Sequence, residues 1–389
     1  MITTQLNSFR VLLVFCCIYC VSSCSTSKKS AGTSSQAAIT TIKLLGEYNV
    51  PYALSYNNTI VGGLSGIDYD SLHNCYYMVS DDRSSVNPAR FYTAAISFTE
   101  KGIDSVHFTS VKSMLQPNGN VYPNSKQDPY NTPDPEAMRY DPLRNQLVWC
   151  SEGERIVRKQ DTVLSDPAIR IIDPGGKFVD SFSIPHNLQM QAIEEGPRQN
   201  SVFEGVSFAD NYKTLFVSVE EPLYEDGPRA DIIENNPYIR ILKFNINSKK
   251  NTAQYAYKLD PVAYSPDPPN AFKINGISDI LSIDNDKLLV IERSFSTGRL
   301  ACTIKIFITD LAPASDIKNI SSLKKNKNFK TAPKKLLLNM DDLGIYIDNI
   351  EGVTFGPVLP NGHKTMLFVA DNNFNPVQKT QLLLFEVMQ

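Results

Sequence analysis

The sequence predicts an all-β chain folded as a β-propeller, a ring of four-stranded blades. The first supporting observation is a repeated β-hairpin: a short apolar strand, a polar turn and a second apolar strand that ends on acidic residues, as in Phe203 to Glu221. The second is its period, since taking positions 66, 137, 205, 276 and 352 as equivalent gives steps of 71, 68, 71 and 76 residues. The third is the scarcity of helical patterns between the hairpins. A near-constant period of strand units is the sequence signature of radial repetition.

Each repeat offers further strands, in which β-forming residues are bounded by Pro, Gly, Asn and Asp. The hairpin strands lie at 66–70 with 76–82, 136–140 with 147–152, 203–208 with 214–221, 276–280 with 288–292, and 351–355 with 366–371. Two outer strands follow in each of the first four repeats, at 90–98 and 105–111, 168–172 and 178–184, 239–246 and 252–259, and 303–308 and 335–339. Five blades can be counted in this way, and a sixth, degenerate blade is the alternative.

The two ends of the chain are predicted to share one blade. The fifth repeat has only one strand after its hairpin, at 382–387, whereas a strand without a partner at 39–50 precedes the first hairpin. A ring of four-stranded sheets closes if this N-terminal strand completes the last blade. Closure also removes an exposed sheet edge. We therefore expect a single propeller domain over residues 39–389.

The first 38 residues are predicted to be a targeting segment and a tether. The apolar run from Val11 to Cys20 has about 10–12 residues, fewer than the roughly 20 that span a bilayer. Val21-Ser-Ser-Cys24 resembles the lipobox of bacterial lipoproteins, which predicts a signal peptide over 1–23 and lipidation of Cys24; an ordinary secretory signal is the alternative. Residues 24–38 are rich in Ser, Thr and Ala, as in flexible tethers. We expect an extracytoplasmic protein, lipid-anchored to the bacterial membrane at its periplasmic face or at the cell surface.

Composition disfavours several functions. A formal net charge of −3 provides no basic field, so nucleic acid is not an expected partner. The 4 His are scattered without ligand spacing, which disfavours zinc. We find no nucleophile elbow, P-loop or dinucleotide fingerprint. The expected protein is a monomer that meets the membrane only through its lipid anchor.

Loop lengths give the ring a polarity. The turns inside the hairpins are short and the connections between blades are long, so the face with the long connections is the candidate functional face. Inner strands begin, and second strands end, on this face beside the axis. Acidic residues stand at both places, and the candidate metal ligands are Asp81, Asp82, Glu136, Glu152, Glu204, Glu220, Glu292, Glu351 and Asp371. Like charges converging on one axis repel unless cations offset them, and oxygen-only ligands suit Ca²⁺. The alternative is structural: such acids also cap turns, pair with Arg or face solvent.

Several runs resemble the phytase-like family, which is described as having esterase-like activity of phytase. The runs are Gly63-Leu-Ser-Gly-Ile-Asp-Tyr-Asp70 with Val79-Ser-Asp-Asp-Arg83, Pro135-Glu-Ala-Met-Arg139 with Ser151-Glu-Gly-Glu154, Phe203-Glu-Gly-Val206, and Ile350-Glu-Gly-Val353 with Val369-Ala-Asp-Asn372. The resemblance covers residues 45–389. It implies a bacterial, exported β-propeller that hydrolyses phosphoric esters with Ca²⁺.

Three functions remain open for the acidic rim. In the first, a phosphoesterase acts on a small phosphorylated molecule, with Glu204 and Glu351 as catalytic carboxylates and with Arg83 and Arg293, joined by Arg155, clamping the anion. In the second, a non-catalytic propeller binds a ligand or a protein at the cell surface. The third, hydrolysis of carbohydrate by paired carboxylates, has less support because no two acids are fixed at a known separation.

Overall fold

The computed structural model describes residues 38–389. The predicted signal peptide, the lipidation of Cys24 and the tether up to residue 37 lie outside the described residues and stay predictions. Within 38–389, no helix combines the length and the apolar character that crossing a bilayer requires.

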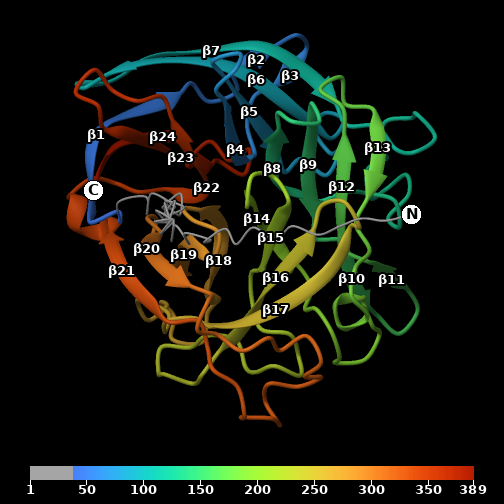
Figure 1. The fold of residues 1–389 in the computed structure, drawn as a ribbon. Helices are drawn as coiled ribbons and strands as arrows, with labels where there is room; N and C mark the ends of the chain where they lie inside the picture. Colours follow the sequence, from blue (N-terminus) through green and yellow to red (C-terminus); the bar gives the residue numbers. More distant parts are fainter. Residues whose placement is uncertain (1–37) are drawn as a thin grey trace, which may run out of the picture. The chain divides into compact units, whose positions relative to one another are not determined.

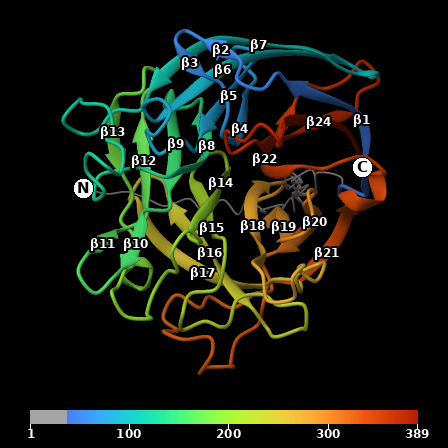
Figure 2. The ribbon, with the colours of Figure 1, turned by 180° about the vertical axis from the view of Figure 1, so that it is seen from behind.

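Five four-stranded antiparallel sheets surround one axis (Figures 1 and 2). From the axis outward, the first is β4 (Leu64–Asp70), β5 (Cys75–Ser80), β6 (Arg90–Thr99) and β7 (Gly102–Ser113). The second is β8 (Pro135–Asp141), β9 (Gln146–Ser151), β12 (Ala168–Ile172) and β13 (Phe178–Ser181). The third is β14 (Phe203–Ala209), β15 (Thr214–Val219), β16 (Tyr238–Asn245) and β17 (Lys250–Lys258). The fourth is β18 (Lys273–Ser282), β19 (Lys287–Ser296), β20 (Thr303–Asp310) and β21 (Lys334–Asn339). The fifth is β22 (Asn349–Gly356), β23 (Lys364–Asp371), β24 (Thr380–Met388) and β1 (Thr41–Val50).

The predicted all-β propeller is therefore confirmed with five blades, and the described residues leave no sixth four-stranded sheet. Only short elements lie outside the blades. They are the hairpins β2 (Ser55–Tyr56) with β3 (Thr59–Ile60) and β10 (Glu154–Val157) with β11 (Thr162–Ser165), and the 3₁₀ turns η1 (His186–Leu188) and η2 (Met340–Leu343).

The N-terminal strand closes the ring, as predicted. β1 runs antiparallel to β24 from the pair Thr41 and Met388 to the pair Val50 and Thr380. Because the last blade takes strands from both ends of the chain, unravelling either end opens the whole ring.

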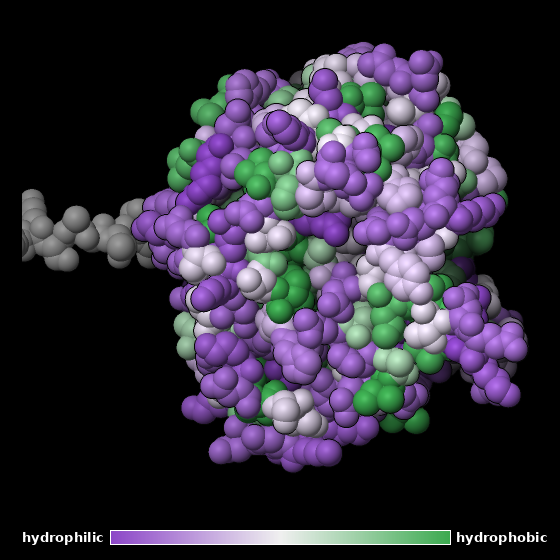
Figure 3. Space-filling model, turned by 90° about the vertical axis from the view of Figure 1, so that its right-hand side faces the viewer, coloured by the Kyte–Doolittle hydropathy of each residue, from purple (hydrophilic) through white to green (hydrophobic). Residues whose placement is uncertain are grey.

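The hydrophobic core lies between neighbouring blades. One cluster joins Ile169 and Phe182 of the second blade to Val217 and Phe244 of the third, with the two phenyl rings 5.6 Å apart. A central blade strand is thus covered on both faces, which explains why β15 is apolar at four of its six positions and buried at every one. On the side of the molecule where β13 lies, hydrophobic residues are instead scattered among hydrophilic ones (Figure 3).

Each inner strand carries a β-bulge at the same place. The pairing of the inner strand with its neighbour shifts between Leu64 and Gly66, Pro135 and Met138, Phe203 and Gly205, Ile277 and Asp279, and Ile350 and Gly352. The equivalent positions are therefore 66, 137, 205, 279 and 352, with steps of 71, 68, 74 and 73 residues. Aligning the fourth repeat on Gly276 was wrong by three residues.

Glycine follows the bulge where neighbouring inner strands come close. A Cβ on Gly205 would lie 2.7 Å from the backbone nitrogen of Ile280, in the next blade. A side chain there would push two blades apart, so the repeated Glu-Gly pair has a packing reason.

Candidate functional site: an acidic chamber on the propeller axis

The bulges place acidic side chains at one end of the axis. The extra residue is an acid in three blades, namely Glu136, Glu204 and Glu351, and a serine in the other two. A bulge bends its strand and redirects a side chain, a device common next to active sites. The second strands add a matching position just beyond the bulge, occupied by Asp81, Glu152, Glu220, Arg293 and Asp371.

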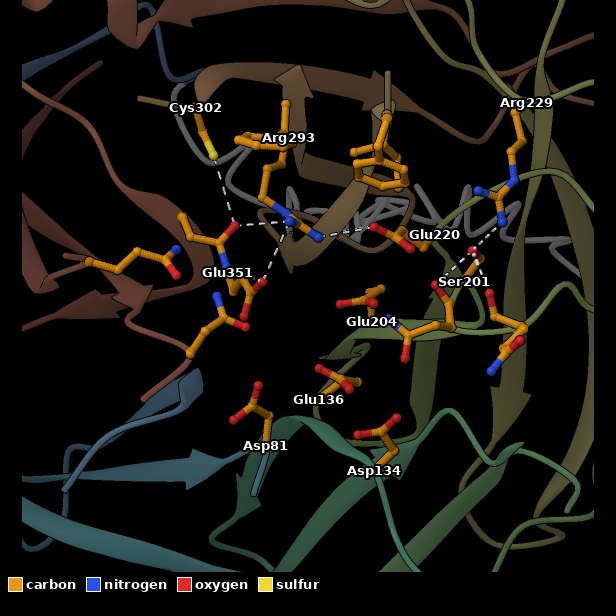
Figure 4. A pocket seen from close by; sticks show the side chains of 18 of the residues that line it. Asp81, Asp134, Glu136, Ser201, Glu204, Glu220, Arg229, Arg293, Cys302 and Glu351 are labelled. Carbon is orange, nitrogen blue, oxygen red and sulfur yellow. Dashed lines mark hydrogen bonds and ion pairs between the residues drawn. The ribbon is translucent and has the colours of Figure 1, made fainter. Parts of the chain in front are cut away.

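Apart from Glu152 and Asp371, these acids, together with Arg293, line a cavity of about 550 Å³, which we call the acidic chamber. Figure 4 shows the carboxylates of Asp81, Asp134, Glu136, Glu204, Glu220 and Glu351 directed into it. In three groups the ligand oxygens lie within 4.8 Å of one another: Asp81, Glu351 and Asp371; Asp134, Glu136 and Glu152; Glu152, Glu204 and Glu220. The last two groups share Glu152. Seven of the nine predicted metal ligands are thus brought together, with Asp134 as an eighth acid.

Several of these carboxylate oxygens have no partner among the described residues. Buried Glu152 Oε2 and Asp371 Oδ2 accept no hydrogen bond. Unpaired buried carboxylate oxygens are costly, because desolvation is not repaid. Glycine even makes room for one acid: a Cβ on Gly63, whose φ is +61°, would lie 2.2 Å from Asp81 Oδ1. The chamber therefore concentrates negative charge that the described chain does not neutralise.

The pKa values of the chamber acids reflect this crowding. Burial, followed by the charge of neighbouring carboxylates, raises the pKa of Glu136 and Glu204 well above the ordinary range. Burial also raises the pKa of Asp134 to about 7 and that of Glu220 to about 8, although Arg83 and Arg293 oppose these shifts. A bound cation would favour the ionised forms.

Three arginines line the chamber, and two of them, Arg83 and Arg293, are the predicted ones. Arg293 Nη2 lies 3.0 Å from Glu220 Oε1, and Arg293 Nη1 donates to Asn349 Oδ1 at 2.8 Å. Glu351 Oε1 is 3.7 Å from Arg293 Nη1 and accepts a hydrogen bond from Asn349. Arg83 lies between Asp134 (3.4 Å) and Glu154 (2.8 Å). The Nε atoms of both arginines are buried without an acceptor among the described residues.

The structure does not bring Asp82 and Glu292 to the chamber, so their placement was wrong. Asp82 Oδ2 accepts from Arg90 and from the backbone of Asn87, both at 2.7 Å. Glu292 accepts from Tyr257 and pairs with Lys334 between the third and fourth blades. Both acids lie one residue away from the chamber position of their strand, and successive side chains in a strand point to opposite faces.

Arg155 also lies elsewhere. Its Nε donates to the carbonyl of Gln191 at 2.9 Å, and its guanidinium covers Tyr224. The sequence pattern did not single out Asp134 as a ligand; this residue directly precedes β8. The pattern also missed a polar stretch from Gln199 to Ser201 and an apolar wall made by the fourth blade, which carry no repeated motif.

Fold and site together define a five-bladed propeller with an acidic axial chamber. A family model described as "Phytase-like: Esterase-like activity of phytase" matches residues 59–374. The chain belongs to this phytase-like family, which confirms the resemblance seen in its motifs.

Solved structures show more distant similarity. An endo-1,4-beta-xylanase from Bacteroides thetaiotaomicron has 8% identity and a TM-score of 0.42, with 84% of this chain and 95% of that one covered. The periplasmic gluconolactonase PpgL of Pseudomonas aeruginosa has 9% identity and a TM-score of 0.35, with 85% and 86% covered. Hydrazine synthase of Kuenenia stuttgartiensis has 12% identity and a TM-score of 0.35, with 83% and 81% covered. At these values none bears on the activity of this chain. No curated protein matches it.

Proposed function

We propose that this phytase-like propeller is a Ca²⁺-dependent hydrolase of phosphoric esters that acts in the acidic chamber. The observation that carries the proposal is the convergence of eight carboxylates, several with unpaired oxygens, beside Arg83 and Arg293. If all were ionised, these eight acids against the three arginines of the chamber lining would leave a net charge of −5. The family description, esterase-like activity of phytase, supports the same reaction class.

The donor set fits calcium. Every candidate ligand atom is a carboxylate oxygen, and Ca²⁺ takes about six to eight oxygen ligands in flexible geometry. Glu152 belongs to two of the three groups and offers the unpaired Oε2, so the groups around Glu136 and Glu204 would hold the ion. When bound, Ca²⁺ supplies positive charge that polarises a phosphoryl oxygen and acidifies a coordinated water.

The chain's own residues then have separate tasks. Arg293 and Arg83 line the cavity, where their guanidinium groups would donate to the phosphoryl oxygens. Glu204 is the candidate general base: no basic side chain lies within ion-pair distance of its carboxylate among the described residues, and burial raises its pKa. Glu351 holds Arg293 in place together with Asn349, so it acts as a positioning residue.

The test is hydrolysis of p-nitrophenyl phosphate by the purified chain lacking residues 1–24. Turnover is expected with Ca²⁺ and is expected to vanish in excess chelator. Glu204→Gln should reduce kcat by about 100-fold or more, the usual effect of removing a general base. Glu194→Gln, an exposed acid outside the chamber, is the matched control and should leave kcat unchanged.

A non-catalytic outcome is equally well defined. If calorimetry shows Ca²⁺ binding that Glu204→Gln weakens, yet no phosphoric ester is hydrolysed above the chelator control, the chamber is a binding site and the hydrolase proposal is rejected. If calorimetry shows no binding of Ca²⁺ to the wild-type protein, the proposed calcium site is rejected as well.

We also propose that the mature protein is a lipid-anchored, extracytoplasmic monomer. The proposal is supported by the lipobox-like Val21-Ser-Ser-Cys24 in front of a Ser- and Thr-rich segment. Labelling with a fatty-acid analogue in a bacterial host should mark wild type and not Cys24→Ser. Light scattering of the purified domain measures the oligomeric state.

A further inference from the structure

The acidic chamber has one wall of a different character. On the side of the fourth blade it is lined by Phe272, Ile274, Phe295 and Leu300. Phe272 and Leu300 remain 56% and 80% exposed. Exposed apolar residues grouped at the mouth of a polar cavity indicate a ligand surface, since scattered ones would need no explanation.

This apolar wall is held in place by the fold. Ile274 pairs with Phe295 across β18 and β19, and the rings of Phe272 and Phe295 lie 6.3 Å apart. Both the backbone N–H and the hydroxyl of Thr297 donate to the carbonyl of Phe272 at 2.9 Å. The backbone carrying the exposed phenyl ring is thus fixed at the cavity mouth.

The apolar wall adjoins the anion-binding arginine. Arg293 and Phe295 are two residues apart on β19, so their side chains leave the same face of the strand. Gly276 pairs with Arg293, and a Cβ there would lie 2.6 Å from Glu220 Cγ, so only glycine leaves room for the Arg293–Glu220 pair. A phosphoryl group held at Arg293 therefore directs its ester group towards Phe295 and Phe272.

The positive charge of the chamber is limited. No lysine is among its lining residues within 38–389, and its three arginines already pair with acids. Arg229 lies 3.2 Å from Glu221, and Arg83 and Arg293 have the partners given above. A phosphate monoester carries a charge of about −1.5 to −2 at neutral pH. Every further phosphate would add negative charge to a chamber that already holds more carboxylates than arginines, so a single phosphate is accommodated more easily than several.

From these observations we infer that the chamber selects phosphoric esters with a single phosphate joined to an apolar group, and disfavours polyphosphorylated substrates such as phytate. The inference rests on the proposed function. Residues Gln199 to Ser201, which also line the cavity, are polar. The preference for an apolar ester group therefore depends on the apolar residues of the fourth blade alone.

The test compares hexyl phosphate with glycerol 3-phosphate, because both have alcohol leaving groups and a single phosphate, and adds phytate. With Ca²⁺, kcat/KM for hexyl phosphate should exceed that for glycerol 3-phosphate by about tenfold or more, the scale of hydrophobic discrimination in enzyme pockets. Phytate should be the poorest substrate. Phe272→Ala and Leu300→Ala, both at exposed positions, should reduce the preference, whereas Leu72→Ala, another exposed leucine, should not.

Binding without turnover separates this inference from the proposed function. Hexylphosphonate and methylphosphonate cannot be hydrolysed, and calorimetry with Ca²⁺ compares their affinities directly. Tighter binding of hexylphosphonate that Phe272→Ala abolishes, with no ester hydrolysed, would keep the selectivity and reject the hydrolase. Hydrolysis without preference, or with phytate preferred, would overturn the selectivity and keep the hydrolase.

Discussion

The two ends of the propeller axis use buried acids in opposite ways. At the end formed by the hairpin turns, a second cavity of about 430 Å³ is lined by Asp68, Arg139, Ser207 and Thr354, among others. There Asp68 accepts from the backbone of Tyr140 at 2.8 Å and from Thr354 at 3.1 Å. In the acidic chamber, on the same inner strands, Glu136 and Glu204 stay without such partners.

Arg139 and Asp279 show what a satisfied acid does at the turn end. Their side chains meet at 2.7 Å, and Asp279 also accepts from the backbone of Val353 at 2.9 Å. Arg139 donates to the carbonyl of Ile67 at 2.6 Å. This network joins four of the five blades across the axis. Burial of an acid is therefore a poor indicator of function, and an unpaired carboxylate oxygen is a better one.

The largest expected effect follows from breaking the pair at the turn end. Asp279→Asn leaves Arg139 charged and buried, and removing one partner of a buried ion pair costs about 3–5 kcal/mol. Burial raises the pKa of Asp279 to about 6, so denaturant unfolding should be measured at pH 8, where the carboxylate is ionised. Stability equal to wild type would show that the pair does not hold the blades together.

Replacing a carboxylate by its amide in the acidic chamber should stabilise the calcium-free protein, whereas Asp279→Asn should destabilise the protein. Glu136→Gln removes one of several repelling carboxylates, so the calcium-free protein should unfold at a higher temperature than wild type. Its Ca²⁺ affinity should fall by about tenfold or more, which corresponds to about 1.4 kcal/mol. Calorimetry and thermal unfolding measure the two quantities. A destabilised calcium-free variant with unchanged affinity would place Glu136 among the structural acids.

The five-bladed ring and most of the acids of the chamber could be predicted from the sequence. Hairpins repeating at a near-constant interval predict radial blades, and the Glu-Gly pairs of two repeats, with Glu136-Ala137 in a third, mark the bulged acids. The fourth repeat misled the alignment, because its bulge is at Ser278 and the residue after it is Asp279 rather than glycine. Gly276 was aligned with the glycines that follow the bulge in other repeats, although the equivalent position is Asp279, three residues later.

Alternation along strands explains the remaining errors. Asp82 and Glu292 are acids at the end of a second strand, as the pattern required, but each is one residue out of phase. A one-residue difference turns a side chain to the other face, and acid composition alone does not fix the phase. The apolar wall depends on Phe272 and Leu300, which belong to irregular connections and have no counterpart in other repeats. It could be found only in three dimensions.

A smaller effect on stability is expected from pH. Its sign should be that of acids whose pKa is raised by folding, so that stability falls as the pH rises. Burial raises the pKa of Asp134 to about 7 and that of Glu220 to about 8, so the native state binds more protons than the unfolded chain between about pH 4 and 8. Stability then falls as pH rises across this range.

In chelator, the Tm should drop between pH 6 and 8.5, and saturating Ca²⁺ should restore most of the loss, because the ion favours the ionised carboxylates. Differential scanning calorimetry in buffers of matched ionic strength measures both curves. A Tm that rises with pH in chelator would contradict the raised pKa values.

The smallest effect is predicted for Arg155, which the strand pattern grouped with Arg83 and Arg293. Its guanidinium donates to the carbonyls of Gln191 and Ile193 and covers Tyr224 at 5.0 Å, away from the chamber lining. Arg155→Ala should leave Ca²⁺-dependent turnover within about twofold of wild type, the scale of a surface substitution. Arg293→Ala should remove most of it. Equal losses in both variants would mean that the reaction also depends on the connection around Gln191, and that unpaired groups in the chamber do not by themselves define the site.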